Sequence, residues 1–129
     1  MENETKANVL VVDDDLTLRD MYQIRLEAEG YKVIVAGDGE EALEVIQKKK
    51  PDIILLDIMM PKMNGYDVLE KLKQNPETNS IPVLILTALI QDLNKAKGLM
   101  SGADDYLMKS EVMPGEVLDK VKKALEKNK

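Results

Sequence analysis

Residues 51–65, which read Pro51-Asp-Ile-Ile-Leu-Leu-Asp-Ile-Met-Met-Pro-Lys-Met-Asn-Gly65, decide how the rest of the chain is interpreted. The uninterrupted apolar run Ile53–Leu56 is typical of a strand buried on both faces, as in a parallel sheet covered by helices. The run ends at the charged residue Asp57, and Pro61 and Gly65 then favour a loop. Because α/β sheets place their sites at the carboxyl ends of strands, Asp57 is predicted to stand at such an edge.

Strand-like and helix-like segments alternate along the whole chain. Strands are predicted at residues 9–12, 31–36, 53–56, 82–86 and 105–108, where apolar and β-branched residues gather. Helices are predicted after each strand from apolar residues at helical spacing, the fourth of them at Gln91–Ser101. Asp38 with Glu41 is typical of a capping box, and Pro114 of a first helical position. This alternation predicts an α/β fold in which helices cover both faces of a parallel five-stranded sheet.

Composition narrows the range of functions. The chain has 129 residues, so a single domain is expected at residues 8–129 after a frayed polar terminus at residues 1–7. The net charge of −6 argues against nucleic acid or an anionic membrane as the partner. The lack of cysteine and histidine excludes disulfides, Ser-His-Asp triads and the usual zinc sites. The sequence shows no signal peptide and no membrane-spanning stretch, and a cytoplasmic protein is expected.

Polar residues stand where the predicted strands end. Asp13 and Asp14 follow the first strand, Asp57 the third, Thr87 the fourth and Lys109 the fifth. These ends share one edge of a parallel sheet, so three carboxylates, a hydroxyl and an ammonium are expected to converge. Carboxylates this close repel one another unless a divalent cation lies between them, and an all-oxygen ligand set suits Mg²⁺. Such a group favours phosphoryl transfer, with a carboxylate able to act as the nucleophile.

Simpler explanations exist for several of these residues. Asp15, the third acid of the run, is predicted to cap the helix that follows rather than to bind a ligand. Thr87 alone can also be explained as a β-branched strand end, Lys109 as a surface lysine, and Tyr106 as a packing residue. Asp57 is the hardest to explain structurally, because a charge directly after a fully apolar strand is costly without a function.

Four short motifs occur in order, each at a predicted strand end. They read Leu-Val-Val-Asp-Asp-Asp at 10–15, Leu-Leu-Asp-Ile-Met-Met-Pro-Lys-Met-Asn-Gly at 55–65, Ile-Leu-Thr-Ala at 85–88 and Asp-Tyr-Leu-Met-Lys at 105–109. Together they resemble the receiver domain of two-component response regulators, the CheY-like family, over roughly residues 8–126. The resemblance implies a single-domain, doubly wound (βα)5 flavodoxin-like fold whose parallel strands lie in the order 2-1-3-4-5.

The resemblance implies a role for each residue of the acidic group. Asp57 is expected to accept the phosphoryl group. The carboxylates of Asp14 and Asp57 and the backbone carbonyl of Met59 are expected to bind Mg²⁺, with Asp13 reaching the metal through water. The donor is expected to be a phosphohistidine on a sensor histidine kinase or on a phosphotransfer protein.

The family also implies a switch. Thr87 is expected to bond one phosphoryl oxygen and Lys109 another, while Tyr106 turns inward as Thr87 moves toward the phosphoryl group. This change is expected to alter the binding of a downstream protein to the face formed by the fourth helix, the fifth strand and the fifth helix. Ser110 stands where the family often has a proline with a cis bond. The Lys109–Ser110 bond is therefore expected to be trans, or cis with strain held by the site.

Particular residues disfavour the other functions. Aspartate-nucleophile phosphatases of the haloacid dehalogenase type carry a second acid two residues after the nucleophile, where this chain has Met59. A flavodoxin-like binding module cradles a phosphate in its first loop, where this chain has three acids that repel one. The complete set of acids, threonine and lysine argues against a non-phosphorylated scaffold. We expect a signalling domain that phosphorylates and slowly dephosphorylates itself, without turnover of an external substrate.

Overall fold

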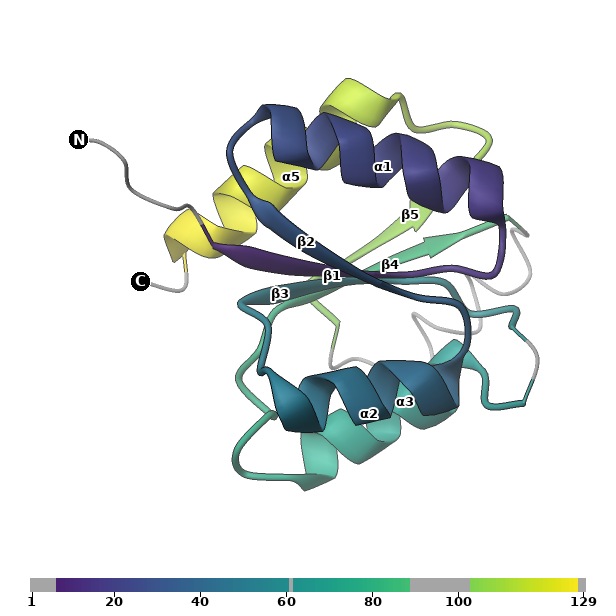
Figure 1. The fold of residues 1–129 in the computed structure, drawn as a ribbon, viewed down its shortest axis with the longest axis vertical. Coiled ribbons are helices and arrows are strands. Elements are labelled where there is room, and N and C mark those ends of the chain that lie inside the picture. Colours follow the sequence, from purple (N-terminus) through teal and green to yellow (C-terminus); the bar gives the residue numbers. More distant parts are fainter. Residues whose placement is uncertain (1–6, 61, 89–102, 128–129) are drawn as a thin grey trace.

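The computed structural model describes residues 7–60, 62–88 and 103–127, and its elements follow the predicted order (Figure 1). They are β1 (Asn8–Val12), α1 (Leu16–Ala28), β2 (Lys32–Ala36), α2 (Gly39–Lys48), β3 (Ile53–Leu56), α3 (Gly65–Gln74), β4 (Val83–Thr87), β5 (Asp105–Met108) and α5 (Pro114–Lys127). The strand bounds differ from those predicted by at most one residue. The fourth predicted helix, Gln91–Ser101, and residues 1–6 of the terminus that we expected to be frayed lie outside the described residues.

The strands form one parallel sheet in the order β2-β1-β3-β4-β5, which confirms the predicted topology. The centre of the sheet is β3, where Ile53 pairs with Val9 of β1 and Ile54 pairs with Val83 of β4. Helices α1 and α5 cover one face of the sheet, and α2 and α3 cover the other (Figure 1). Because the strands are parallel, their carboxyl ends all lie along one edge.

The core explains the unbroken apolar run in β3. Successive side chains of a strand point to opposite faces, and in this sheet both faces are covered. Ile54 and Leu56 pack with residues of α2 and α3, whereas Ile53 and Leu55 pack with residues of α1 and α5. All four are at most 2 % exposed, and burying such a side chain stabilises the fold by roughly 1.5–3 kcal/mol. The predicted buried strand is therefore confirmed.

Side-chain caps begin two of the helices as predicted, with one difference. The carboxylate of Asp15 accepts a hydrogen bond from the Leu18 N–H at the start of α1, which confirms its capping role. Asp38 accepts from the Glu41 N–H at the start of α2. The Glu41 carboxylate, however, accepts from the N–H of Gly37 and not from that of Asp38, so only half of the predicted capping box is formed. Pro114 is the first residue of α5, as predicted.

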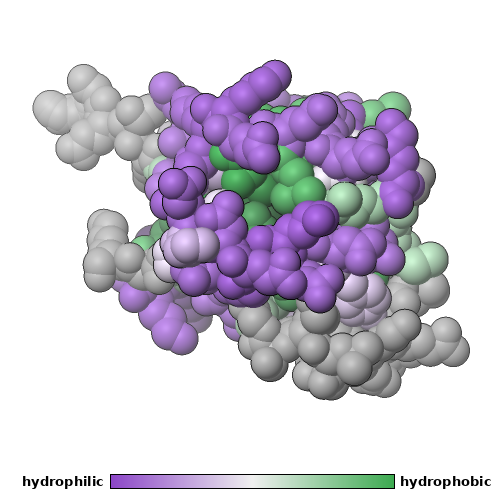
Figure 2. All heavy atoms as spheres, turned by 90° about the horizontal axis from the view of Figure 1, so that it is seen from below, coloured by the Kyte–Doolittle hydropathy of each residue, from purple (hydrophilic) through white to green (hydrophobic). Residues whose placement is uncertain are grey.

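The face formed by α2 and α3 carries a shallow hollow. Figure 2 views the molecule from this side, and apolar atoms are visible there between hydrophilic side chains. The hollow has a volume of about 460 Å³ and lies between the carboxyl halves of the two helices; it is lined by Leu43, Ile46, Gln47, Lys50, Lys71, Leu72, Asn75, Glu77 and Thr78. It therefore lies at the opposite edge of the sheet from the carboxyl ends of the strands. Among the described residues, no helix has both the length and the apolar character needed to cross a membrane.

Candidate functional site

Strand pairing brings three carboxylates together at the edge of the sheet. β1 and β3 are neighbours, and the N–H of Asp57 donates to the carbonyl of Val12 at 3.0 Å. One carboxylate oxygen from each of Asp13, Asp14 and Asp57 lies within 4.8 Å of the others. Asp13 is 4 % exposed and Asp57 3 %, whereas Asp14 is exposed. The predicted convergence of these residues is therefore present, with two buried acids and one facing solvent.

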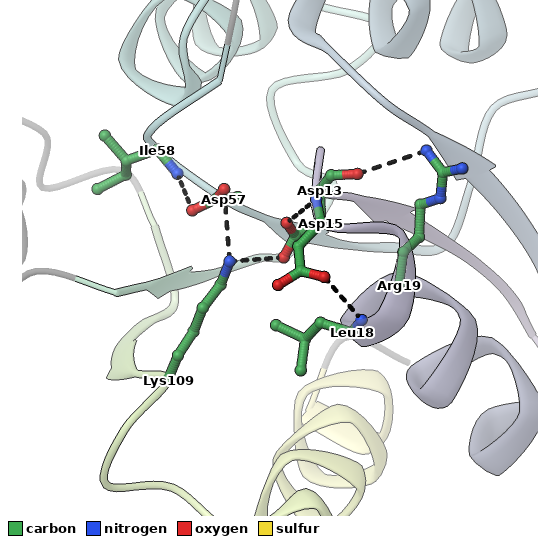
Figure 3. A network of polar contacts seen from close by, with 7 residues as sticks. All are labelled: Asp13, Asp15, Leu18, Arg19, Asp57, Ile58 and Lys109. Atoms are coloured by element: carbon green, nitrogen blue, oxygen red, sulfur yellow. Dashed lines mark hydrogen bonds and ion pairs between the residues drawn. The ribbon is translucent and has the colours of Figure 1, made fainter.

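Lys109 reaches this acidic cluster from the loop after β5 (Figure 3). Its Nζ lies 2.8 Å from Asp13 Oδ2 and 3.5 Å from Asp57 Oδ2. The N–H of Lys109 donates to the carbonyl of Thr87 at 2.7 Å, so β4 holds the loop in place. The described residues contain no cis peptide bond, and the Lys109–Ser110 bond is trans. One ammonium thus faces two buried carboxylates.

Burial and repulsion change the acidity of the site. Burial, and then the charge of Asp13, raise the pKa of Asp57 from 3.8 to about 6, although Lys109 and the Ile58 N–H act in the opposite direction. Burial alone lowers the pKa of Lys109, but the hydrogen bond to Asp13 and the charges of Asp57 and Asp13 raise it overall. At neutral pH the site is therefore a crowded pair of carboxylates held by one lysine, with excess negative charge.

Thr87 and Tyr106 lie on adjacent strands and on the same face of the sheet. Tyr106 of β5 pairs with Ile85 of β4, and Thr87 stands two residues beyond Ile85, which is the spacing of side chains that share a face. Tyr106 is half-buried against the core beneath α2 and α3. Thr87 is fully buried, and its Oγ1 has no hydrogen-bond partner within the part of the chain that the structure describes. Buried hydroxyls usually have a hydrogen-bond partner, so Thr87 Oγ1 is a candidate donor to a ligand.

The loop between β3 and α3 carries the remaining predicted residue. The N–H of Ile58 donates to Asp57 Oδ1 at 2.9 Å and orients that carboxylate. Met59, whose carbonyl is an expected metal ligand, follows in this loop and is 52 % exposed. The loop turns back sharply, because the N–H of Gly65 donates to the carbonyl of Ile58 at 2.9 Å. A side chain at Gly65 would collide with the Asp57 carbonyl, so glycine is required there.

Comparison with known proteins identifies the family and the fold of the chain. The model of the response regulator receiver domain family matches residues 9–122. The chain belongs to this family. Among solved structures, the receiver domain of a Francisella response regulator is 37 % identical, with a TM-score of 0.85, and the match covers 96 % of this chain and 100 % of that one. The response regulator TrrA of Thermotoga maritima, solved in complex with Mg²⁺ and BeF, is 31 % identical with a TM-score of 0.79, over 92 % of this chain and 99 % of that one.

Curated relatives of this receiver domain are longer proteins. The DNA-binding response regulator MtrA of Mycobacterium tuberculosis is 41 % identical over 123 residues, which are 95 % of this chain and 52 % of that protein. A probable transcriptional regulator of Guillardia theta is 43 % identical over 106 residues, 82 % of this chain and 41 % of that protein. The chain thus spans about half the length of these relatives. The expectation that nucleic acid is not a partner follows from the charge of the receiver domain alone and does not extend to a longer regulator.

Sequence reasoning missed one residue beside the acidic cluster of the receiver domain. Arg19 of α1 donates from a guanidinium nitrogen to the backbone carbonyl of Asp13 at 3.4 Å (Figure 3). Its position four residues after the N-cap Asp15 places it on the first turn of α1. That spacing is the only signal in the sequence, since an arginine on a helix is usually solvated. Arg19 therefore supports the loop that carries Asp13 and Asp14.

Proposed function

We propose that this receiver domain accepts a phosphoryl group on Asp57 and signals its presence through Thr87 and Tyr106. The observation that carries the proposal is a nearly buried carboxylate at the end of the central strand, with Lys109 3.5 Å away and, at the end of the neighbouring β4, a buried Thr87 hydroxyl that has no hydrogen-bond partner among the described residues. A buried carboxylate costs stability unless it has a function. An ammonium and a hydroxyl donor are the groups that three additional phosphoryl oxygens require.

The donor set at this edge fits Mg²⁺. Carboxylate oxygens of Asp13, Asp14 and Asp57 lie close together with excess negative charge, and hard divalent cations prefer such oxygen ligands. Asp14 and Asp57 with the Met59 carbonyl would hold the ion, and Asp13 would contact it through water. When bound, Mg²⁺ supplies positive charge that neutralises the phosphoryl oxygens. The complex of TrrA with Mg²⁺ and BeF supports Mg²⁺ binding by this chain.

The transfer needs few groups from the protein. An oxygen of Asp57 attacks the phosphorus of a phosphohistidine, the phosphorus–nitrogen bond breaks, and its electron pair stays on the imidazole nitrogen. Lys109 Nζ, already 3.5 Å from Asp57 Oδ2, pairs with one phosphoryl oxygen, and the Thr87 hydroxyl donates to another. Return of the group to water is slow, because Met59 stands where a phosphatase has its second acid and the chain has no histidine. We therefore propose a phospho-acceptor without turnover of an external substrate.

The partners follow from the transfer. A sensor histidine kinase or a phosphotransfer protein supplies the phosphoryl group, and both act in the cytoplasm. The output face combines β5 and α5 with residues 91–101, which lie outside the described residues. Thr87 and Tyr106 share a face of the sheet on adjacent strands. This arrangement supports a coupled movement, in which a displacement of Thr87 changes the position of Tyr106. Phosphorylation then shifts the population of conformations that a downstream protein recognises.

Intact mass tests the acceptor proposal. The domain is incubated with Mg²⁺ and acetyl phosphate, and we expect a gain of one phosphoryl group that EDTA prevents, because repulsion at the acidic cluster is then not neutralised. Binding of Mg²⁺ without any gain in mass would instead indicate a scaffold. Continuous release of phosphate from small phosphate esters would indicate a phosphatase. Either result contradicts the proposal.

Replacing Thr87 by valine tests the switch. Valine keeps the shape of threonine but lacks the hydroxyl, so the rate of phosphoryl acceptance is expected to fall by about tenfold, the value of one hydrogen bond. The phosphorylated variant still forms on long incubation. With 3-fluorotyrosine in the protein, phosphorylation is expected to shift the ¹⁹F signal of Tyr106 in the parent but not in Thr87→Val, with Tyr106→Phe assigning the signal. An equal shift in both proteins would show that Thr87 does not drive Tyr106.

A further inference from the structure

The corner between β2 and α2, residues Gly37–Gly39, carries none of the site residues but lies against segments that support them. On one side Gly37 faces Arg19 of α1, and Ala36, directly before the corner, accepts a hydrogen bond from the N–H of Asp13. On the other side the corner meets the loop after β3, which follows Asp57. The corner therefore contacts the loop after Asp57 directly, and the loop of Asp13 and Asp14 only through Ala36 and Arg19.

Gly39 makes the closest of these contacts. Its N–H donates to the carbonyl of Met63 at 3.1 Å, joining the start of α2 to the loop after β3. A Cβ at Gly39 would collide with the Met63 carbonyl oxygen and lie only 2.8 Å from the Met63 Cβ. These are backbone and near-backbone atoms, so no side-chain rotation relieves the collision. Asp38 and Lys62 form an ion pair at 3.7 Å beside this contact.

On the other side of the corner, Gly37 faces a side chain that can move. A Cβ at Gly37 would lie 2.9 Å from a guanidinium nitrogen of Arg19, the same nitrogen that donates to the carbonyl of Asp13. The N–H of Asp13 also donates to the carbonyl of Ala36, directly before the corner, at 3.0 Å. The end of a long side chain moves at little cost. The two glycines thus differ: Gly39 faces fixed backbone, and Gly37 faces a flexible group.

We propose that this corner fixes the position of the loop after β3, and that Gly39 is a positioning residue for Mg²⁺ binding. The inference rests on the proposed function, because it concerns the same metal. Mg²⁺ demands near-octahedral oxygen ligands and tolerates little displacement of any of them. A methyl group at Gly39 pushes the Met63 backbone away from α2. The loop between Asp57 and Met63 then shifts relative to Asp13 and Asp14.

Three alanine variants of matched chemistry test the inference. Gly39→Ala is expected to weaken Mg²⁺ affinity by about tenfold, the loss typical when support around a metal site is disturbed. Gly37→Ala is expected to weaken it less than Gly39→Ala does, since it displaces only the flexible end of Arg19 and no backbone. Gly115→Ala in α5 is the control, because a Cβ there meets nothing within 4 Å. Affinity is measured by calorimetry, and the free energy of unfolding without Mg²⁺ is measured for each variant.

The outcomes separate this inference from the proposed function. A parent that binds no Mg²⁺ overturns both. A parent that binds, with Gly39→Ala equal to Gly115→Ala in affinity, overturns the positioning role alone, even if Gly39→Ala is less stable. Should Gly39→Ala fail to fold, amide hydrogen exchange of the parent protein tests the positioning role of Gly39 instead. Mg²⁺ is expected to slow exchange of the Gly39 N–H more than that of the Lys49 N–H, which bonds Val45 within α2, and equal slowing contradicts the proposal.

Discussion

Asp57→Asn is expected to abolish phosphoryl acceptance, with no gain in mass after incubation with Mg²⁺ and acetyl phosphate. The amide of asparagine is a very poor nucleophile, and the substitution removes one of the carboxylates that we propose as metal ligands. Asp57 is 3 % exposed and pairs with Lys109, so the site has no other carboxylate in the same position to replace it. Asp67→Asn, at an exposed residue in the first turn of α3, is the matched control and is expected to behave as the parent.

The same substitution is expected to stabilise the metal-free protein at neutral pH. In the folded parent the pKa of Asp57 is raised from 3.8 to about 6 by burial and by Asp13. Between about pH 4 and about pH 6 the folded state keeps a proton that the unfolded state has lost, so the stability from this group falls as pH rises. The neutral amide of the variant has no such charge. We expect the variant to gain about 2 kcal/mol in free energy of unfolding above pH 6 and little below pH 4.

Chemical denaturation across this pH range, with EDTA present, measures that difference. Mg²⁺ is expected to close the gap, because it stabilises the parent much more than the variant. If phosphorylation of Asp57→Asn persists at the parental rate, another residue is the acceptor. If instead the variant is less stable than the parent at neutral pH, the carboxylate of Asp57 stabilises the fold, and its burial beside Asp13 does not carry the expected cost.

Lys109→Met is expected to increase the affinity for Mg²⁺ and to decrease the rate of phosphoryl transfer. Lys109 Nζ lies 2.8 Å from Asp13 and 3.5 Å from Asp57, so it competes with Mg²⁺ for the same carboxylates. Its removal is expected to tighten Mg²⁺ binding about fivefold, the effect of roughly 1 kcal/mol of released repulsion. The rate of phosphoryl transfer is expected to fall by about 100-fold, since a preorganised charge aimed at the phosphoryl oxygens is lost.

A second lysine provides the control for this pair of effects. Lys120 of α5 pairs with Asp105 at 2.8 Å, the same distance as Lys109 to Asp13, but outside the acidic cluster. Lys120→Met is therefore expected to change neither Mg²⁺ affinity nor transfer rate. Calorimetry gives the affinity and intact mass over time gives the rate. A loss of both properties in Lys109→Met would mean that the lysine holds the loop after β5 and has no direct part in the transfer.

The elements and their order were predictable because burial imposes local patterns. The run Ile53–Leu56 is apolar throughout, since both faces of β3 are covered, and it was recognisable without any knowledge of its neighbours. Asp15 was recognisable as a cap because a carboxylate before a helix bonds the free N–H groups of its first turn. The capping box at Asp38 was only half right, because the Glu41 side chain accepts from the N–H of Gly37, one residue before the cap.

The residues of the candidate site were also predictable from the sequence, since the carboxyl ends of parallel strands lie along one edge of the sheet. Asp13, Asp57 and Lys109 follow three different strands and meet as the topology requires. The sequence did not predict which of the two acids is buried. Asp13 and Asp14 are identical neighbours in the chain, and only packing distinguishes them. The raised pKa of Asp57 likewise depends on the closeness of Asp13 and on burial, which no local pattern encodes.

The amino-acid order alone thus determined the α/β architecture, the edge where the chemistry lies and the residue types gathered there. Periodicity, capping residues and strand ends are properties of neighbours in the chain, and they survive without tertiary contacts. Only the tertiary structure decided that Arg19 supports the loop of Asp13 and that Gly39 must lack a side chain beside Met63. Those contacts join segments far apart in the sequence, and their geometry arises when helices pack onto a common sheet.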